Sequence, residues 1–201
     1  MAEKSPFEDL KDEHVALLTE MNELQSTVRG LMGGEAGSLG GGAVLRDELE
    51  MFQRTLRIHF RREEEGLFPE ATRMISEGAQ GADVFGSFFG EEAEDDMSAH
   101  AALARRAKEM LEIAVQMEDA GGPDESSAQK LRALAALTSG LLQRHAAKED
   151  TLIFPMLEQG LKPDQVAQVS ERLKEIGSDR DLSERGSPEE GGLTQLGGGS
   201  E

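Results

Sequence analysis

The sequence predicts an all-α protein, an antiparallel up-down-up-down four-helix bundle followed by a short fifth helix at its C-terminal end. Apolar residues recur three and four positions apart through four long stretches of the 201-residue chain, which is the period of amphipathic helices. Residues of high helix propensity, chiefly Leu, Ala, Glu, Lys and Arg, dominate these stretches. The segment 59–69 also returns, in altered form, at 145–155. These observations favour two related helical hairpins that pack against each other.

The first predicted helix begins at Ser5. This residue is suited to cap the helix, Pro6 to occupy its first turn and Glu8 to complete a capping box. A glycine-rich connection at 33–42 ends the helix. The positions expected to face the core are Phe7, Leu10, His14, Leu17, Leu18, Met21, Leu24, Val28 and Leu31.

The second predicted helix ends near Gly78, which suits the left-handed stop of a helix. A link at about 79–90 follows, and we expect its three phenylalanines to pack over one end of the bundle. The third helix is expected from about Glu91 to Glu118, where the glycines and proline of 119–123 break it. The core-facing positions of these two helices are Leu45, Leu49, Phe52, Leu56, His59, Glu63, Leu67, His100, Leu103, Ala107, Met110, Leu111, Ala114 and Met117.

The fourth predicted helix carries the second copy of the repeated segment, and Pro163 opens the short fifth helix. Residues 1–177 are expected to form one bundle domain, and 178–201 a disordered acidic tail rich in Gly and Ser. The core-facing positions here are Leu131, Leu134, Leu141, His145, Glu149, Leu152, Val166, Val169, Leu173 and Ile176.

The composition excludes several classes of function. A formal net charge of −19 argues against binding to nucleic acid or anionic membranes, because both require clustered cations. The chain has no cysteine and no tyrosine, which excludes disulfides, thiolate metal sites and tyrosyl ligands. Its first residues do not resemble a signal peptide, and no apolar stretch approaches the about 20 residues of a membrane span. We therefore expect a cytoplasmic protein that binds neither nucleic acid nor membranes.

The repeat places histidines and glutamates at matched positions. In both copies a His-x-x-x-Glu pair lies on one helix face, because residues four apart are neighbours there. The copies are 86 residues apart, and the two remaining histidines have the same separation. Counted from the turns between helices, all four histidines lie at one height, roughly 25 Å along each helix. The residues expected to converge are His14, His59, Glu63, His100, His145 and Glu149.

Four imidazoles and two carboxylates exceed the four ligands of a structural zinc ion. They suit two metal ions, each bound by two histidines and bridged by both carboxylates and an oxide or hydroxide. Iron is the expected metal, with manganese or zinc as alternatives. Each ion would keep a position open to a small ligand such as O₂, NO or peroxide.

This pattern, in which each His-x-x-x-Glu runs on to Phe-Pro, resembles the hemerythrin-like, HHE cation-binding domains. The resemblance covers about residues 5–160, and it implies a four-helix bundle in which the six residues above bind a non-haem di-iron centre. Oxygen-carrying members place a further histidine where this chain has Ala104, and an aspartate ligand where it has Asp150. Glu149 fits the internal repeat, so we expect it to be the ligand and keep Asp150 as a candidate. Ala104 favours reactivity towards peroxide or NO over simple reversible O₂ carriage.

Residues next to the expected ligands have supporting roles. We expect Glu64, Glu65 and Asp150 to be solvated or to orient imidazoles from outside the centre. Pro69 and Pro155 remove amide donors, so each is expected to kink or end its helix just past the ligands.

Three functional hypotheses follow. The first is a di-iron protein that binds O₂, NO or peroxide in oxidative or nitrosative stress or in iron handling. The second is a di-iron enzyme with catalase-like, peroxide-disproportionating activity. The third is an iron-donor or sensor module that acts through a partner protein.

Overall fold

The computed structural model describes residues 4–32, 41–76 and 82–176, without the side chains of residues 32 and 74–94. Within these ranges the chain is helical apart from short connections, and no strand occurs there. The elements are α1 (Pro6–Met32), α2 (Gly41–Arg61), the π-helical segment η1 (Arg62–Leu67), α3 (Phe68–Ser76), α4 (Ala82–Asp119), α5 (Glu125–Lys148), the π-helical segment η2 (Glu149–Ile153), α6 (Phe154–Gly160) and α7 (Pro163–Ile176).

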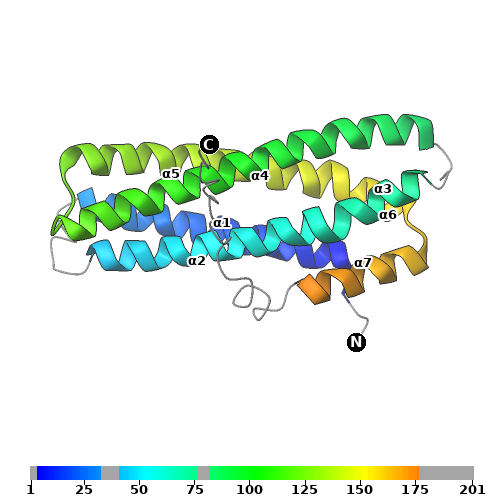
Figure 1. Ribbon diagram of the computed structural model, residues 1–201, viewed down its shortest axis with the longest axis horizontal. Helices are drawn as coiled ribbons and strands as arrows, with labels where there is room; N and C mark the ends of the chain where they lie inside the picture. Colours follow the sequence, from blue (N-terminus) through cyan, green and yellow to red (C-terminus); the bar gives the residue numbers. More distant parts are fainter. Residues whose placement is uncertain (1–3, 33–40, 77–81, 177–201) are drawn as a thin grey trace, which may run out of the picture.

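The elements form four long rods, which are α1, α2–η1–α3, α4 and α5–η2–α6, and the rods pack as a bundle (Figure 1). α1 packs against α2 and α5, and α4 packs against the same two helices, so α1 and α4 occupy opposite corners. Rods that follow one another in the sequence run in opposite directions, and α7 folds back alongside one end of the bundle, against η1 and α1. The predicted four-helix bundle with a short C-terminal helix is therefore confirmed.

The starts of two helices follow from side-chain caps. Ser5 Oγ accepts a 3.1 Å hydrogen bond from the Glu8 amide, and the Glu8 carboxylate accepts one of 3.0 Å from the Ser5 amide. This is the predicted capping box, and it satisfies two amides that the helix itself leaves without partners. At the start of α5, Asp124 Oδ1 accepts a 3.0 Å hydrogen bond from the Ser127 amide.

The π-helical segments interrupt the two rods that carry the repeated motif. The Phe68 amide donates to the Glu63 carbonyl, and the Phe154 amide donates to the Glu149 carbonyl, each five residues back. The effect of Pro69 and Pro155 therefore differs from the expected kink or helix end just past the ligands. The irregular turn lies before each proline, and the rod continues beyond it as α3 or α6. A wider turn accommodates a residue that has no amide hydrogen to donate to the carbonyl four positions earlier.

The helix α4 is longer than the sequence pattern predicts. It begins at Ala82, whereas the expected link covered 79–90 and the expected start was near Glu91. The segment 82–90 contains glycines but no proline, so no residue in it prevents a helix from extending. The expected packing of its three phenylalanines lies outside the described side chains.

Two apolar clusters fill the bundle, and a layer of buried histidines and glutamates lies between them. This polar layer contains His14, His59, Glu63, His100, His145 and Glu149. On α1, Leu10 belongs to the cluster near α7 and Leu17 to the larger cluster, with His14 between them. On the fourth rod, Leu142 and Ile153 flank the layer in the same way. Full burial of one such side chain stabilises the fold by about 1.5–3 kcal/mol. The two clusters therefore hold the polar layer in place from both sides.

The helix α7 is fitted to the π turn of η1. A Cβ atom at Gly66 would lie 2.6 Å from Leu173 Cδ2, so any side chain here would require the buried Leu173 side chain to shift. Arg172 Nε donates a 3.4 Å hydrogen bond to the Glu65 carbonyl, which lies four residues before a proline and so lacks its α-helical donor. The predicted tail, 178–201, lies outside the described residues.

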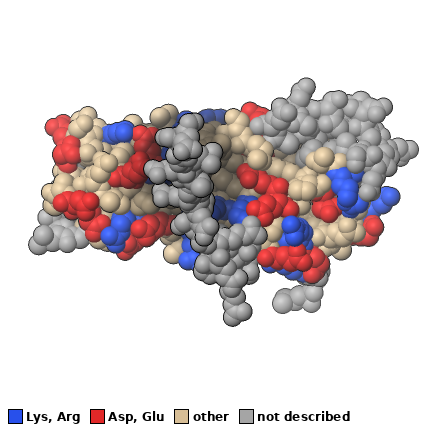
Figure 2. Space-filling view, in the orientation of Figure 1, with Lys and Arg blue, Asp and Glu red and all other residues tan. Residues whose placement is uncertain are grey.

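The surface is strongly acidic. Figure 2 shows Asp and Glu side chains over much of the visible face, with Lys and Arg in smaller groups among them. This agrees with the 40 acidic and 21 basic residues of the chain. Of the described helices, none combines the length and apolar character needed to cross a membrane.

Candidate metal centre

The four histidines meet in the polar layer, one from each rod. The ring centroids of His14 and His59 are 4.7 Å apart and those of His100 and His145 are 4.8 Å apart, whereas 5.9 Å separates His14 from His145. Each of these residues is at most 2% exposed. The common height expected from residue counting is therefore observed, and the rings fall into two close pairs.

Two fully buried glutamates lie in the same layer. Oxygens of Glu63 lie 3.3 Å from His59 Nε2 and 3.2 Å from His100 Nε2. Glu149 repeats this arrangement with the two remaining histidines, at 2.9 and 3.4 Å from their Nε2 atoms. Each carboxylate thus lies between an imidazole of its own rod and an imidazole from the other half of the chain.

The atoms that face the centre of the layer have no hydrogen-bond partner within the described protein. This is true of Nε2 in all four imidazoles and of both oxygens in Glu63 and Glu149. An unsatisfied buried polar group costs about 1–3 kcal/mol, so this concentration of such atoms is unfavourable without a ligand. A cation satisfies imidazole nitrogens and carboxylate oxygens together, and these donors fit a metal site.

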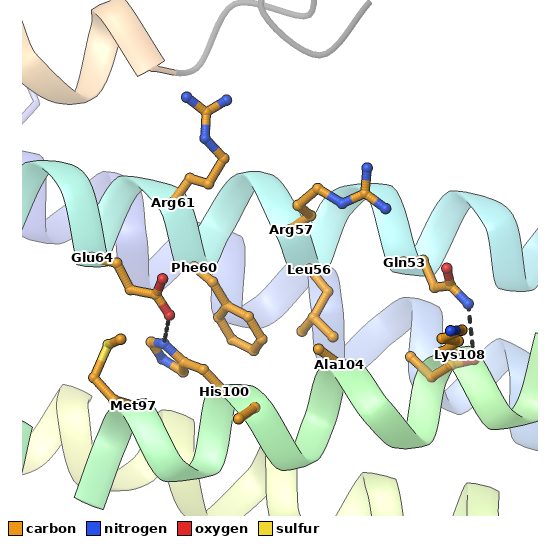
Figure 3. Close-up of a pocket in the computed structure, with 12 residues that line it drawn as sticks. Gln53, Leu56, Arg57, Phe60, Arg61, Glu64, Met97, His100, Ala104 and Lys108 are labelled. Atoms are coloured by element: carbon orange, nitrogen blue, oxygen red, sulfur yellow. Dashed lines mark hydrogen bonds and ion pairs between the residues drawn. The ribbon is translucent and has the colours of Figure 1, made fainter. Parts of the chain in front are cut away.

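Carboxylates hold the imidazoles from the outer side. Asp150 Oδ1 lies 2.9 Å from His14 Nδ1, and Glu64 Oε1 lies 2.8 Å from His100 Nδ1 (Figure 3). An ionised carboxylate only accepts hydrogen bonds, so Nδ1 carries the proton and the Nε2 lone pair points into the layer. Glu64 and Asp150 lie where orienting groups are expected from the sequence, while Glu65 is ion-paired within its own helical rod.

Two further orienting carboxylates do not follow from the repeat. Glu13 Oε2 lies 3.0 Å from His59 Nδ1, and Asp96 Oδ1 lies 3.2 Å from His145 Nδ1. Neither acid has an acidic counterpart 86 residues away. In the sequence, the feature that could have identified Asp96 is its position one turn before His100, on the inward face of the same helix. Glu13 is adjacent in sequence to the α1 histidine but acts on α2.

The phenylalanines of the repeated Phe-Pro pairs stack on the imidazoles. The rings of Phe154 and His14 are 5.6 Å apart with planes at 5°, and those of Phe68 and His100 are 6.3 Å apart with planes at 11°. Phe60 stacks more closely on His100, at 3.9 Å. These apolar rings restrict the imidazole planes and keep that side of the layer dry.

Burial controls protonation in the layer. Desolvation lowers the pKa of His14 and His100, and it lowers the pKa of His59 well below the usual range, so these rings are neutral at neutral pH. Desolvation, followed by repulsion from neighbouring carboxylates, raises the pKa of Glu63 well above its usual range. Desolvation also raises the pKa of Glu149 well above its usual range. Bound cations would reverse the effect on both glutamates, because they favour the ionised carboxylates.

Asp96 behaves differently from the two glutamates. Burial opposes its ionisation, but the hydrogen bond with His145, followed by smaller effects of other neighbours, holds the pKa of Asp96 at about 2. Its Oδ1 also lies 3.8 Å from Lys148 Nζ. Asp96 therefore stays ionised and accepts the Nδ1 proton of His145 at neutral pH.

The clustered residues have the composition of a metal site. The ligand atoms of His14, His59, His145 and Glu149 lie within 4.8 Å of one another, as do those of Glu63, His100, His145 and Glu149. These two groups share members and together exceed the four ligands of a tetrahedral ion. The fold and the site define a class: helical-bundle proteins that could hold metal ions at a buried centre between the rods.

Comparison with known families agrees with this class. A model of the hemerythrin HHE cation binding domain matches residues 5–109, and the chain belongs to this family. The matched segment contains four of the six clustered residues, while His145 and Glu149 lie beyond it. The structure brings these two residues to the others. No curated protein matches the chain.

Proposed function

We propose that this protein holds two iron ions in the polar layer and binds a small ligand, O₂, NO or peroxide, at them. The role we infer is in oxidative or nitrosative stress or in iron handling. Manganese or zinc would suit the same donors. The observation that supports the proposal best is the set of buried, unpartnered nitrogen and oxygen atoms that face one centre.

The two close ring pairs support two ions rather than one. In this proposal His14 and His59 bind one ion, and His100 and His145 bind the other. Glu63 and Glu149 would supply carboxylate oxygens to both ions, since each lies between imidazoles of both halves.

The protein has three tasks at this centre. Four outer carboxylates fix the Nδ1 protons and so present four Nε2 lone pairs. The phenylalanine rings exclude water from part of the layer. One turn after His100, Ala104 supplies a methyl group in place of a further ligand. Two iron ions in this setting supply a redox-active centre for diatomic or peroxide ligands.

Metal loading of the full-length protein tests this proposal. After anaerobic loading with Fe²⁺ and removal of unbound metal, we expect about two iron ions per chain, the number that six such donors suit. The optical spectrum should then change on addition of O₂, peroxide or NO to separate samples. Replacing Glu149→Ala should abolish loading, whereas Glu158→Ala, an exposed glutamate on α6, should not.

Different results would point elsewhere. Loading that does not exceed that of the Glu149→Ala variant would contradict the metal centre. Oxygen evolution from peroxide above the level of free iron, lost in His59→Ala, would instead establish the catalase-like alternative. An unchanged spectrum with all three ligands would exclude the proposed ligand class.

A further inference from the structure

A groove of about 540 Å³ lies between α2 and α4, beside the polar layer (Figure 3). This volume is within the range of about 300–1,000 Å³ that is usual for small-molecule sites. His100 and Glu64 line it at one end, so the groove adjoins the centre. Phe60 and Ala104 also border both the groove and the centre, while the other lining residues have no role in the proposed metal site.

The lining of the groove is largely apolar. Leu56 and Phe60 contribute from α2, and Ala101 and Ala104 contribute from α4. The small alanine side chains leave open space between two rods that larger residues would fill. Met97, which also lines the groove, is 44% exposed. Contact with an apolar molecule removes this surface from water, which lowers the free energy of the system.

The charge of the lining is opposite to that of the whole chain. It contains three basic residues, Arg57, Arg61 and Lys108, and one acidic residue, Glu64, which is occupied by His100. Glu65 already holds Arg61 through hydrogen bonds of 3.0 and 3.2 Å, whereas Lys108 Nζ forms only an exposed 3.8 Å pair with Glu112. Arg57 and Lys108 are therefore the cations that a ligand can engage. The chain as a whole has 21 basic and 40 acidic residues. Long basic side chains reach across apolar surface with their charge in water, so they suit the anionic head of a ligand.

We propose that this groove binds an amphipathic carboxylate, a straight-chain fatty acid of about ten carbons, a ligand size suited to a pocket of this volume. Its alkyl chain lies on Leu56, Phe60 and the alanines. Its carboxylate pairs with Lys108 and with Arg57, an exposed side chain that points away from α4 in Figure 3 and turns to the rim when the ligand binds. This inference goes beyond the proposed function and does not depend on which metal the centre holds.

Calorimetric titration of the full-length protein tests the inference, with decanoate, 1-decanol and acetate as probes. We expect saturable binding of decanoate, weaker binding of 1-decanol by about fivefold, as for loss of one surface ion pair, and no binding of acetate. Decanoate carries both the alkyl chain and the carboxylate, 1-decanol carries the alkyl chain without the charge, and acetate carries the carboxylate without the long chain.

Variants locate the binding site. Ala104→Leu, which fills the groove, should weaken decanoate binding at least about tenfold, since it displaces the alkyl chain. Its matched control is Ala136→Leu, an exposed alanine on α5 outside the groove. The double variant Arg57→Gln with Lys108→Gln should weaken decanoate by about fivefold and leave decanol unchanged. Arg105→Gln with Arg132→Gln removes the same charge outside the groove and should change neither.

Three outcomes would overturn the inference: no saturable binding of decanoate, equal binding by Ala104→Leu and Ala136→Leu, or acetate binding as strong as that of decanoate. The last would place the carboxylate on a bound metal ion. The metal content of each sample is measured separately. Decanoate binding by a protein that takes up no metal would support the groove while contradicting the proposed function.

Discussion

Each imidazole of the polar layer has one nitrogen on a carboxylate and the other directed to a shared centre. This arrangement is costly for the metal-free protein at the two glutamates. Glu63 is fully buried, and desolvation together with repulsion from Glu149 raises its pKa well above that of an unfolded glutamate, 4.5. Because the pKa of Glu63 is raised in the folded state, its contribution to the free energy of unfolding is fully present below pH 4.5, where the carboxyl is protonated in both states. This contribution is lost as the pH rises through the folded-state pKa.

Glu63→Gln should therefore stabilise the metal-free protein while it abolishes metal loading. At pH 7 we expect the free energy of unfolding to rise by about 1–3 kcal/mol, because the substitution removes a buried ionisable group. The gain should shrink as the pH approaches 4.5, where the wild-type carboxyl is protonated in both states. Urea denaturation at pH 7 and near pH 4.5 measures the change in the free energy of unfolding, with Glu158→Gln as the exposed control. A variant less stable than wild type at pH 7 would contradict this account.

The outer carboxylates should affect metal affinity without contacting the ions. Asp96→Asn should weaken metal binding about 10–100-fold, because the amide no longer holds the His145 ring as a carboxylate does. Asp95→Asn is the matched control, since this neighbour is exposed and pairs with Lys148 at 3.0 Å. Competition titration with a chelator measures both affinities. Equal losses in the two variants would indicate a general effect of charge instead.

At the scale of the elements, the π turns and α7 act together. Each π segment includes a buried glutamate of the layer and is followed directly by a phenylalanine that stacks on an imidazole. α7 covers η1, where Gly66 permits close contact with Leu173. The helix α7 therefore supports the turn that positions Glu63.

Gly66→Ala should destabilise the protein, by about 1 kcal/mol, because the added methyl group overlaps the Leu173 side chain. Gly30→Ala on α1 is the matched control: nothing lies within 4 Å of its Cβ position, so it should stabilise by about 0.5–1 kcal/mol. Thermal denaturation compares the two. In a Leu173→Ala background the penalty of Gly66→Ala should disappear, and a persistent penalty would place the strain elsewhere.

At the scale of the whole molecule, the polar layer joins all four rods between two apolar clusters. Bound ions would connect every rod at this height, while the metal-free layer concentrates unsatisfied polar atoms there. Metal binding should therefore stabilise the complete bundle by mass action.

Chelator treatment should lower the melting temperature by about 5–10 °C at pH 7.5, and by less at pH 5.5. Protons compete with metal for the ligands as the pH falls: the glutamates, with raised pKa values, take protons first, and the imidazoles, with lowered pKa values, follow below pH 6.5. Calorimetry with and without chelator measures the difference. A larger effect of chelator at pH 5.5 would give the opposite sign and contradict the assignment of these ligands.

Much of the fold is predictable because helical periodicity is local. The capping box at Ser5 and the end of the third helix near Glu118 are read from a few adjacent residues; the capping box is observed, and the helix ends one residue later, at Asp119. The start of α4 at Ala82 could not be predicted from the sequence, because glycines within 82–90 weaken the helical pattern although the helix extends through them. The π turns are also missed, since a proline indicates a disturbed helix but not the side on which the disturbance falls.

The sequence by itself determined that four amphipathic helices carry two equivalent sets of histidine and glutamate, because the repeat and the helical period are properties of spacing along the chain. Only the tertiary structure decided which carboxylate stands behind which imidazole. Glu13 and Asp96 act on histidines of neighbouring rods. Such contacts depend on how far each helix is rotated and shifted against the next, and interhelical packing sets those two quantities.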